Sequence, residues 1–578
     1  MARQASKKSK QKQRTHGKTI VIRDPIHGYV RVAPHERIVV DHPITQRLRH
    51  VLQTGLAYLI FPEARTSRFV HSLGAMHLAS RFLLACVENA ERSTAEAFFA
   101  ALQAHASIKK GLVKLEEFDL LWAPEEPGTQ TGLLSSRAVF PGRLSSDEER
   151  RRRRLLTFAE AGLRLAALFH DLGHLPFSHD LEIALDAFDK RVRKQQQALP
   201  PGMEQVLFGN VPPHEKIGHQ LSKLVLRSLV QPSTSPAIRA VYALAQEILD
   251  TEPPYEDKTH PRANVLEWMH SLIDGEVDVD RADYLLRDGR ALGFEFAAYD
   301  LERLVDHLTL VREEHLGFAT AIHEAGLSAL ETFFVSRARS NQAMVRHHKN
   351  AQAGAAFRYA SITAFETQKG QEFLRAIGRL FDPKLLDAQE KVIPHELEGF
   401  SRFDDGYWVQ ALREAADAQQ PPLLNACLKL VLQRGDSLRS LWKRKGDVPD
   451  GTLRKLNEVL ASNEPMTQRE LARRQEALHQ RGVLVISHKF KPFRVFSARP
   501  DPQKERETYS VMLVRTDERG LLPAARLSPL IRALKEAWDD EPHMHAFALK
   551  SAQVDTLDII NELVQGLPFS SQAKRKGT

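Results

Sequence analysis

Histidine and aspartate residues are concentrated in the segment 170–180, directly after an apolar stretch. They are His170, Asp171, His174, His179 and Asp180. Imidazole and carboxylate groups together suit a divalent cation such as Mn, Fe, Zn or Mg. Neighbouring helical residues point about 100° apart, so His170 and Asp171 reach one ion only where a helix ends. Gly173 and Pro176 predict such an end, although a histidine that merely caps a helix would give the same dipeptide.

Two further segments make a metal centre the better interpretation. Arg68 and His71 stand at the start of a helical pattern in 65–74, and in 278–288 the residues Asp280, Asp283 and Arg287 recur at helical spacing. A charge run of this kind is otherwise typical of a solvated helix face. In chain order, the sequence now contains a histidine, a His-Asp pair and an aspartate, each in a helical context.

That order resembles the HD-domain superfamily of metal-dependent phosphohydrolases. Five longer strings are similar to its deoxynucleoside triphosphate triphosphohydrolase branch, which includes bacterial deoxyguanosine triphosphohydrolases and an animal enzyme with a sterile alpha motif. The strings are DPIHG at 24–28, QRLR at 46–49 with QTG at 53–55, RFVHSLG at 68–74, HDLGH at 170–174 and DVDRADY at 278–284. The similarity is dense from about 19 to 350 and thinner to about 545, where FDDGYW at 403–408 is only loosely similar to the family's C-terminal lobe.

The resemblance implies one catalytic metal ion (Mn, Fe, Zn or Mg) in each active site, with an additional Mg accompanying the substrate. Its implied ligands are His71, His170, Asp171 and Asp280. Such an ion polarises a phosphoryl group and lowers the pKa of water. The family's reaction releases deoxynucleoside and inorganic triphosphate from a deoxynucleoside triphosphate.

Non-ligand histidines are implied beside the metal, and any of them is a candidate general acid because histidine titrates near neutral pH. They are His174, His179 and His214. Glu215 follows His214 and is expected to fix the tautomer of one ring.

Substrate contacts are implied by the same resemblance. Arg68, Arg281 and Tyr284 correspond to phosphate-contacting positions, and arginine suits that role because its planar fork binds two phosphate oxygens. Asp288 resembles the residue that accepts a hydrogen bond from the sugar 3′-hydroxyl. Gln53 resembles one that contacts sugar and base.

The sequence departs from the family pattern in two places. Thr54 stands where the animal enzyme has a bulkier apolar side chain, so discrimination against ribonucleotides is open. In 337–349 an ungapped match puts Ala338 and Arg346 where the family has Arg and Tyr, which leaves Arg337 or Arg339 for the phosphate and leaves the base preference open.

An activating nucleotide binds between subunits of the animal enzyme, and some residues here resemble that site. They are Val21, Asp41, Gln46 and Arg49. Gln46 and Arg49 belong to a string shared with members that lack the activator, so a packing role is the alternative. We expect a homo-oligomer (dimer, tetramer or hexamer).

The elements that position these residues are predicted to be mainly helical, as an HD-domain core with a small α+β module near the C-terminus. Strands are expected at 19–22 and 30–32, and Ser146 with Glu149 forms a capping box for a helix to about Leu172. Arginines 150–154 suggest either phosphate binding or, after Asp147–Glu149, a salt-bridged face. The expected divisions are a basic disordered tail at 1–18, the HD domain at 19–365 with an insert loop at about 123–146, a helical lobe at 366–480, the α+β module at 481–565 and a basic tail at 566–578.

Composition narrows the class of protein. The 578 residues are 42 % hydrophobic and 27 % charged, as in soluble globular proteins, and two cysteines allow no disulfide framework. The net charge is +8, but the two tails carry ten basic and no acidic residues, so the rest is 8 − 10 = −2. These tails are typical of solvated ends, with nucleic-acid binding or a localisation signal as alternatives. No apolar stretch is long enough to span a membrane, and we expect a cytoplasmic protein.

Three functions compete at this point. The leading one is metal-dependent hydrolysis of deoxynucleoside triphosphates, which would lower the nucleotide pool and could serve defence against a virus. The second is an HD phosphatase or nuclease acting on monophosphates, cyclic nucleotides or single-stranded nucleic acid. The third is a non-catalytic nucleotide-binding scaffold, against which the complete set of implied metal ligands argues.

Overall fold

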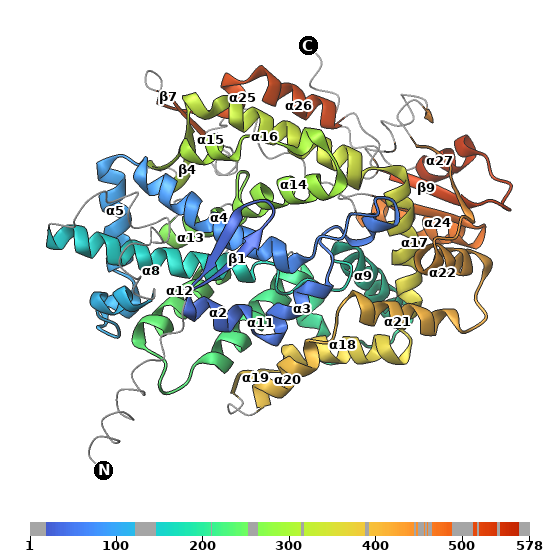
Figure 1. Cartoon of the computed structure of the whole chain (residues 1–578). Coiled ribbons are helices and arrows are strands. Elements are labelled where there is room, and N and C mark those ends of the chain that lie inside the picture. Colours follow the sequence, from blue (N-terminus) through green and yellow to red (C-terminus); the bar gives the residue numbers. More distant parts are fainter. Residues whose placement is uncertain are drawn as a thin grey trace.

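The structure of the chain is a computed structural model (Figure 1). It describes residues 19–121, 146–209, 211–251, 264–313, 317–387, 392–443, 447–448, 456, 459, 465–487, 513–516, 520–539 and 544–565. Both basic tails lie outside the described residues, as do residues 123–145 of the insert loop expected at about 123–146.

Long helices build the centre of the molecule, where α4 lies against both α8 and α14, and α8 against α12 (Figure 1). These four are α4 (Arg68–Glu88), α8 (Asp147–Phe169), α12 (Pro236–Asp250) and α14 (Val279–Leu292). The remaining elements of the N-terminal half are β1 (Ile20–Asp24), β2 (Gly28–Val32), α2 (Pro34–Val40), α3 (Pro43–Arg47), η1 (Leu48–His50), η2 (Gly55–Leu59), α5 (Arg92–Gln103), α6 (Ala106–Lys109), η3 (Leu115–Leu120), α9 (His179–Lys194), α10 (Met203–Leu207), α11 (Pro213–Leu229) and α13 (Val265–Ser271). The mainly α architecture expected from the sequence is confirmed.

The C-terminal half adds helices and short strands around this centre. Its elements are η4 (Glu295–Ala297), α15 (Leu301–Asp306), β3 (Leu308–Glu313), β4 (Gly317–His323), η5 (Glu324–Gly326), α16 (Leu327–Ser340), the π-helical η6 (Asn341–Val345), α17 (His348–Ala364), α18 (Gln368–Leu380), α19 (Pro383–Asp387), α20 (Val392–Phe400), α21 (Asp405–Ala416), α22 (Pro422–Gln433), β5 (Leu438–Ser440), α24 (Pro465–Gln480), β6 (Val483–Ser487), β7 (Leu513–Thr516), β8 (Gly520–Pro523), α25 (Ala524–Leu527), α26 (Pro529–Asp539), β9 (Met544–Leu549) and α27 (Thr556–Val564).

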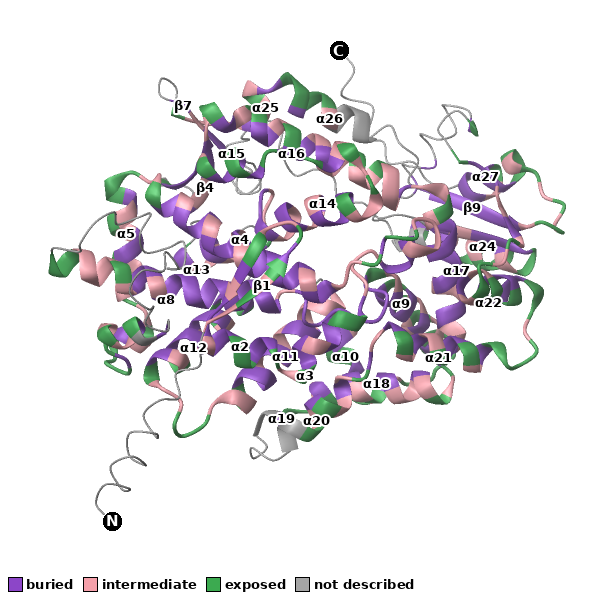
Figure 2. Cartoon of the chain, in the orientation of Figure 1, coloured by how far each residue is buried: buried purple, intermediate pink, exposed green. Residues whose placement is uncertain are grey.

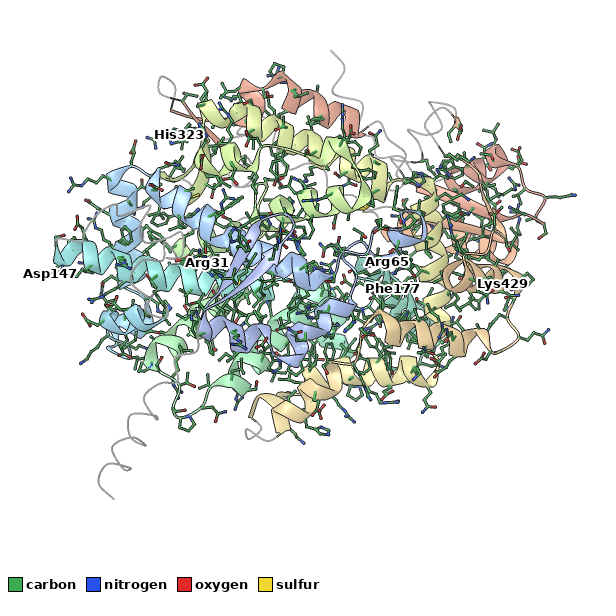
Figure 3. All side chains as sticks on the ribbon, in the orientation of Figure 1. Arg31, Arg65, Asp147, Phe177, His323 and Lys429 are labelled. Carbon is green, nitrogen blue, oxygen red and sulfur yellow. The ribbon has the colours of Figure 1, made fainter. Side chains whose placement is uncertain are left out.

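Helix α8 begins at the expected capping box. The Ser146 hydroxyl accepts a hydrogen bond from Glu149 N at 3.1 Å, and the Glu149 carboxylate accepts one from Ser146 N at 3.2 Å. Its first turns, from Asp147 at the outer end (Figure 3), carry ion pairs such as Arg152 with Glu148 and Arg154 with Asp119. The salt-bridged face is therefore confirmed for these arginines. The helix ends at Phe169, three residues before the expected Leu172.

The strands expected in one C-terminal module divide between two sheets. Strand β7 pairs in parallel with β4 and then with β8, in the order β3-β4-β7-β8. Strands β6 and β9 instead form the sheet β5-β9-β6. The physical reason is that the free edge of β4 offers unpaired backbone groups, which a strand from distant sequence can satisfy.

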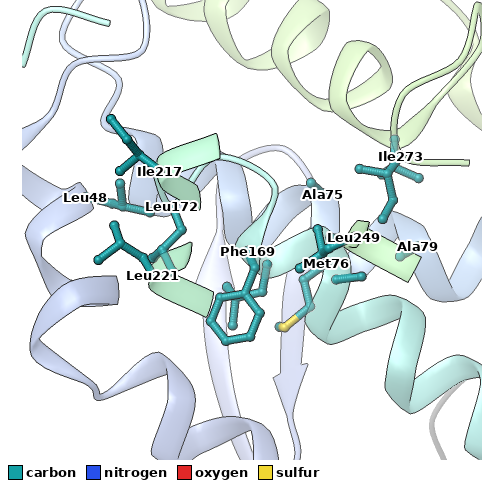
Figure 4. Packing of buried hydrophobic residues seen from close by; sticks show 14 of the residues in the cluster. Leu48, Ala75, Met76, Ala79, Phe169, Leu172, Ile217, Leu221, Leu249 and Ile273 are labelled. Atoms are coloured by element: carbon teal, nitrogen blue, oxygen red, sulfur yellow. The ribbon is translucent and has the colours of Figure 1, made fainter. Parts of the chain in front are cut away.

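A continuous apolar core lies among the central helices, and α4 and α8 are buried along most of their length (Figure 2). Leu172, which follows the His-Asp pair, belongs to it with Leu48, Ile217 and Leu221 (Figure 4). Burying one such side chain contributes about 1.5–3 kcal/mol, so the His-Asp loop is anchored by its own leucine. Contrary to the expectation that no apolar stretch is long enough to span a membrane, helix α4 has that length and apolarity. In the structure, 78 % of its apolar window is buried, as in a core helix.

Candidate active site

Three helices deliver the expected metal ligands to one place. Helix α4 contributes His71 from its first turn, the C-terminal end of α8 contributes His170 and Asp171, and the first turn of α14 contributes Asp280. The ligand atoms of His71, His170 and Asp280 all lie within 4.8 Å of one another. Asp171 completes the group, with one oxygen 3.4 Å from His71 Nε2 and the other 3.5 Å from His170 Nε2.

Both histidines turn their Nε2 atom toward this centre. His170 Nδ1 lies 2.7 Å from Ala167 O and His71 Nδ1 lies 2.8 Å from Asp283 Oδ2, and since both partners only accept, each Nδ1 is the donor. Each Nε2 is buried and faces a carboxylate, with His71 Nε2 3.0 Å and His170 Nε2 3.8 Å from Asp280 Oδ1. In its neutral form each ring would offer the Nε2 lone pair to a divalent ion held by these carboxylates. These residues therefore fit a metal.

The charge balance of the centre also favours a cation. Burial lowers the pKa of His71, but hydrogen bonds to Asp280 and Asp283 outweigh it and raise that pKa to about 10. Burial raises the pKa of Asp280, yet the neighbouring His170 and His71 bring it below its ordinary value. The carboxylates thus stay ionised and attract positive charge, which a divalent ion would supply.

A buried network behind His71 holds its orientation. Asp283 accepts from His71 with one oxygen, lies 2.6 Å from His27 Nε2 with the other, and receives two hydrogen bonds of 2.8 Å from Arg287. Arg287 also donates to Asp24 at 2.8 Å. The DPIHG turn thereby reaches the metal centre through Asp283, a role for Asp24, His27, Asp283 and Arg287 that sequence reasoning missed. The helical spacing of Asp283 and Arg287 was its only signal.

Arg68 and His174 hold the carboxylate of Asp171, one of the expected metal ligands. Arg68 Nη1 donates to Asp171 Oδ2 at 2.5 Å, and His174 Nε2 lies 3.1 Å from Asp171 Oδ1. Burial raises the pKa of Asp171, but Arg68 and the nearby histidines bring it well below its usual value. Arg68, expected to contact phosphate, is 4 % exposed and already paired.

The three other implied histidines surround one carboxylate, that of Glu182. Glu182 Oε2 lies 3.0 Å from His214 Nδ1 and 3.5 Å from His179 Nδ1, while Glu182 Oε1 lies 3.5 Å from His174 Nδ1. The rings of His174 and His214 stack at 4.2 Å. Sequence reasoning missed Glu182, although its place one turn after His179 was a usable signal. It named Glu215, which lies next to His214 at the start of α11.

Gly173 lets helix α11 pack directly against the loop that follows the His-Asp pair. A Cβ on Gly173 would lie 2.0 Å from His214 O and 2.2 Å from Gly218 N, so only glycine lets the two backbones touch. This contact brings His214 against His174.

The environment separates the protonation states of these histidines. Burial, with the charges of Arg68 and His214, lowers the pKa of His174 to about 3. Burial also lowers that of His214, but Glu182 reverses the effect and raises it above its ordinary value. Burial raises the pKa of Glu182, and the charge of His214 overcomes this. Near neutral pH, His174 is therefore neutral and His214 shares its proton with Glu182.

The expected sugar contacts include two acceptors without partners. Gln53 Oε1 and Asp288 Oδ1 are both buried and have no hydrogen-bond partner. Burial raises the pKa of Asp288 to about 7. Groups of this kind are costly unless a ligand satisfies them. Tyr284 is half-buried on the same helix, α14.

The other implied residues have different surroundings. Arg281, expected to contact phosphate, pairs with Asp278, the N-cap residue of α14, and donates to Gly275 O. Its guanidinium is thus bound near the N-terminus of its own helix. Arg339 is exposed near the end of α16, and Arg346 is buried directly after the π-helix η6. A π-helical turn is common at functional sites.

The residues expected to bind an activator lie at the surface. Arg49 Nε donates to Gln46 Oε1 at 2.6 Å, and its guanidinium lies 3.8 Å from the centre of the Phe69 ring. Asp41 is exposed at the end of α2, and Val21 is 55 % exposed on β1. The roles of these four residues stay predictions.

Comparison with known proteins agrees with this geometry. No protein-family model matches the sequence. An uncharacterized protein of Methanocaldococcus jannaschii is 27 % identical over 327 residues, which are 57 % of this chain and 46 % of that protein. Human deoxynucleoside triphosphate triphosphohydrolase SAMHD1 is 25 % identical over 300 residues, which are 49 % of this chain and 35 % of that protein. The chain is related to the HD-domain, dNTPase-like family.

A solved structure supports the fold of the chain. A phosphohydrolase from Bacteroides thetaiotaomicron superposes with a TM-score of 0.51 at 17 % identity, covering 92 % of this chain and all of that one. The chain spans less than half the length of the curated relatives named above. The family resemblance and the HD fold expected from the sequence are confirmed; the roles of single residues stay predictions.

Proposed function

We propose that this chain is a metal-dependent phosphohydrolase that converts deoxynucleoside triphosphates into deoxynucleoside and inorganic triphosphate. The observation that carries the proposal is the convergence of His71, His170 and Asp280, with both Nε2 atoms buried and facing carboxylate oxygens. The unpartnered acceptors Gln53 and Asp288 support a sugar-bearing substrate.

The divalent ion would be held by His71, His170, Asp171 and Asp280. When bound, it would polarise the phosphoryl group and lower the pKa of water. In the overall reaction, water adds to the α-phosphorus, the bond from phosphorus to the 5′-oxygen breaks, and that oxygen takes up a proton.

His179 is the member of the histidine group that suits the leaving oxygen. Its side chain is 63 % exposed, and its Nδ1 faces Glu182, so its Nε2 is turned away from that carboxylate. Donation from Nε2 would leave a neutral ring oriented by Glu182. His214, 14 % exposed, and the buried His174 are better placed to hold Glu182.

The decisive experiment incubates purified protein with the four deoxynucleoside triphosphates, singly and mixed, with Mg or Mn, and separates products by ion-pair chromatography. Nucleoside plus triphosphate is expected, and activity in mixtures alone would reveal a nucleotide activator. Survival of every triphosphate would contradict the proposal, and monophosphates, cyclic nucleotides and single strands would be tested next. Ribonucleotides belong in the same assay because Thr54 leaves that discrimination open.

A variant pair tests the centre itself. His170→Ala with Asp171→Ala is expected to abolish turnover and metal retention while the fold persists by circular dichroism. His219→Ala is the matched control, because His219 is a half-buried histidine of α11 that lies 3.8 Å from Asp250 and outside both histidine groups. Retained activity in the double variant would remove the metal assignment.

A further inference from the structure

The turn that leads into His179 has an unusual backbone. Phe177 and Ser178 have φ values of 56° and 57°, and both lie in the region that side chains with a Cβ rarely adopt. The turn separates His174 from helix α9, which carries His179 and Glu182. Conformations of this kind persist only where the surroundings enforce them. Whatever holds this turn therefore sets the position of His179.

The group that holds it is Asp405, from the FDDGYW string of the C-terminal lobe. Phe177, in the middle of the molecule (Figure 3), donates its backbone N–H to Asp405 Oδ1 at 2.7 Å. The second oxygen, Oδ2, accepts from Leu52 N at 3.0 Å, and Leu52 precedes Gln53. Ser178 Oγ donates to Leu52 O at 3.1 Å, which joins the two held segments directly. Asp405 itself is 9 % exposed.

Arg47 provides a second connection between the same parts. It donates to Phe403 O at 2.8 Å and, with its other terminal nitrogen, to Leu172 O and His174 O at 2.8 and 2.9 Å. Residues 403–405 are thus joined to Leu172 and His174 through Arg47 and to Phe177 through Asp405.

We propose that Asp405 is a positioning residue of the active site, which holds the Phe177–Ser178 turn and the Leu52–Gln53 segment in one register. The role needs a carboxylate, because the two backbone N–H donors reach different oxygens of Asp405. An asparagine amide at this position has only one acceptor oxygen. Its NH2 group would therefore face one of the two backbone N–H groups, and both are donors. This role rests on the proposed function only in that the site is called an active site. Because Asp405 belongs to the C-terminal lobe, that lobe becomes part of the site.

Hydrogen exchange of the full-length chain tests the proposal without substrate. In Asp405→Asn, the amides of Leu52 and Phe177 are expected to exchange on the order of tenfold to a hundredfold faster than in wild type, with the rest of α21 unchanged. Asp404→Asn is the matched control: Asp404 caps α21 by accepting from Tyr407 N, asparagine caps equally well, and among the described residues the amides of Leu52 and Phe177 donate to Asp405 and not to Asp404. Metal content is expected to be the same in all three proteins.

Kinetics separate positioning from stability. For Asp405→Asn we expect kcat to fall at least about tenfold with the melting temperature above that of the assay, and Asp404→Asn to match wild type.

Unchanged exchange at both amides, exchange raised uniformly over the lobe, or equal losses in the two variants would each overturn the proposal. If Asp405→Asn does not fold, wild-type exchange decides, since fast loop-like exchange at Leu52 and Phe177 would also overturn it. If the wild type hydrolyses no nucleotide, the proposed function is contradicted. The exchange result would still test whether Asp405 holds the two segments.

Discussion

Asp283 decides which nitrogen of His71 faces the metal centre, although it is not expected to bind the ion. Its carboxylate accepts a hydrogen bond from His71 Nδ1, so Nε2 is the nitrogen that faces the centre. It can do this only because Gly74 leaves room: a Cβ there would lie 1.9 Å from Asp283 Oδ1 and 2.6 Å from Arg287 Nη2.

Gly74→Ala is therefore expected to displace Asp283 and weaken metal affinity by about 10–100-fold. Affinity would be measured by competition with a chelating dye. Gly399→Ala is the matched control, because no atom lies within 4 Å of the added Cβ on helix α20. Unaltered metal affinity in Gly74→Ala would show that Asp283 does not orient His71.

Asp288 gives a pH dependence that can be tested by unfolding. Its pKa is about 7 in the folded chain against an ordinary 3.8, so between these values the folded state holds the proton more tightly than the unfolded state. The contribution of Asp288 to stability therefore falls as pH rises through this window. Asp288→Asn does not titrate, and its stability relative to wild type is expected to rise between about pH 4 and about pH 8, by up to a few kcal/mol. Urea unfolding at both pH values measures this, and a constant difference would contradict it.

At the scale of elements, one buried ion pair fastens the N-terminal elements to the central helices. Arg164 of α8 contacts Glu36 of α2 at 2.5 and 2.9 Å, and it also donates to Ser80 of α4 and to Arg31 O of β2. Both partners are at most 1 % exposed. Burial disfavours the charged form of each, and their mutual attraction outweighs it, which raises the pKa of Arg164 and lowers that of Glu36.

Arg164→Met is expected to destabilise the chain by about 3–5 kcal/mol, because it leaves Glu36 charged, buried and without its cation. Arg164→Met combined with Glu36→Gln should lose less than the sum of the single changes. The exposed pair Arg92–Glu96 is the control, and Arg92→Met should change stability by less than about 1 kcal/mol. Denaturant unfolding of the full cycle checks this, and additive losses would argue against a coupled pair.

At the scale of the whole molecule, the charge is divided between a nearly neutral body and two basic tails. The tails account for ten positive charges, while the remaining chain carries −2. Polyanions are attracted by concentrated charge, so the tails rather than the body are expected to govern nucleic-acid retention.

Deleting residues 1–18 is expected to leave nucleotide hydrolysis unchanged and to weaken retention on single-stranded DNA, most clearly at low salt. Binding titrations at several salt concentrations measure the effect, and the logarithmic salt slope should fall in magnitude with the lost charges. Substituting three of the seven basic residues of this tail provides an intermediate variant. Loss of hydrolysis on deletion would instead make the tail part of the catalytic assembly.

The sequence alone predicted the helical class, the capping box of α8 and the residues that meet at the candidate metal centre. These features depend on local periodicity, on hydrogen bonds within a few residues, and on motif strings that resemble a family. His71, His170 and Asp280 could be named because each string is recognisable without its partners.

Only the tertiary structure decided the contacts between distant segments. Glu182 among three histidines, Asp283 behind His71, Asp405 beside Phe177 and the pairing of β7 with β4 join residues that carry no mutual signal in the chain. The physical reason is that a buried donor needs an acceptor but does not specify where along the chain it comes from. Packing chooses the partner.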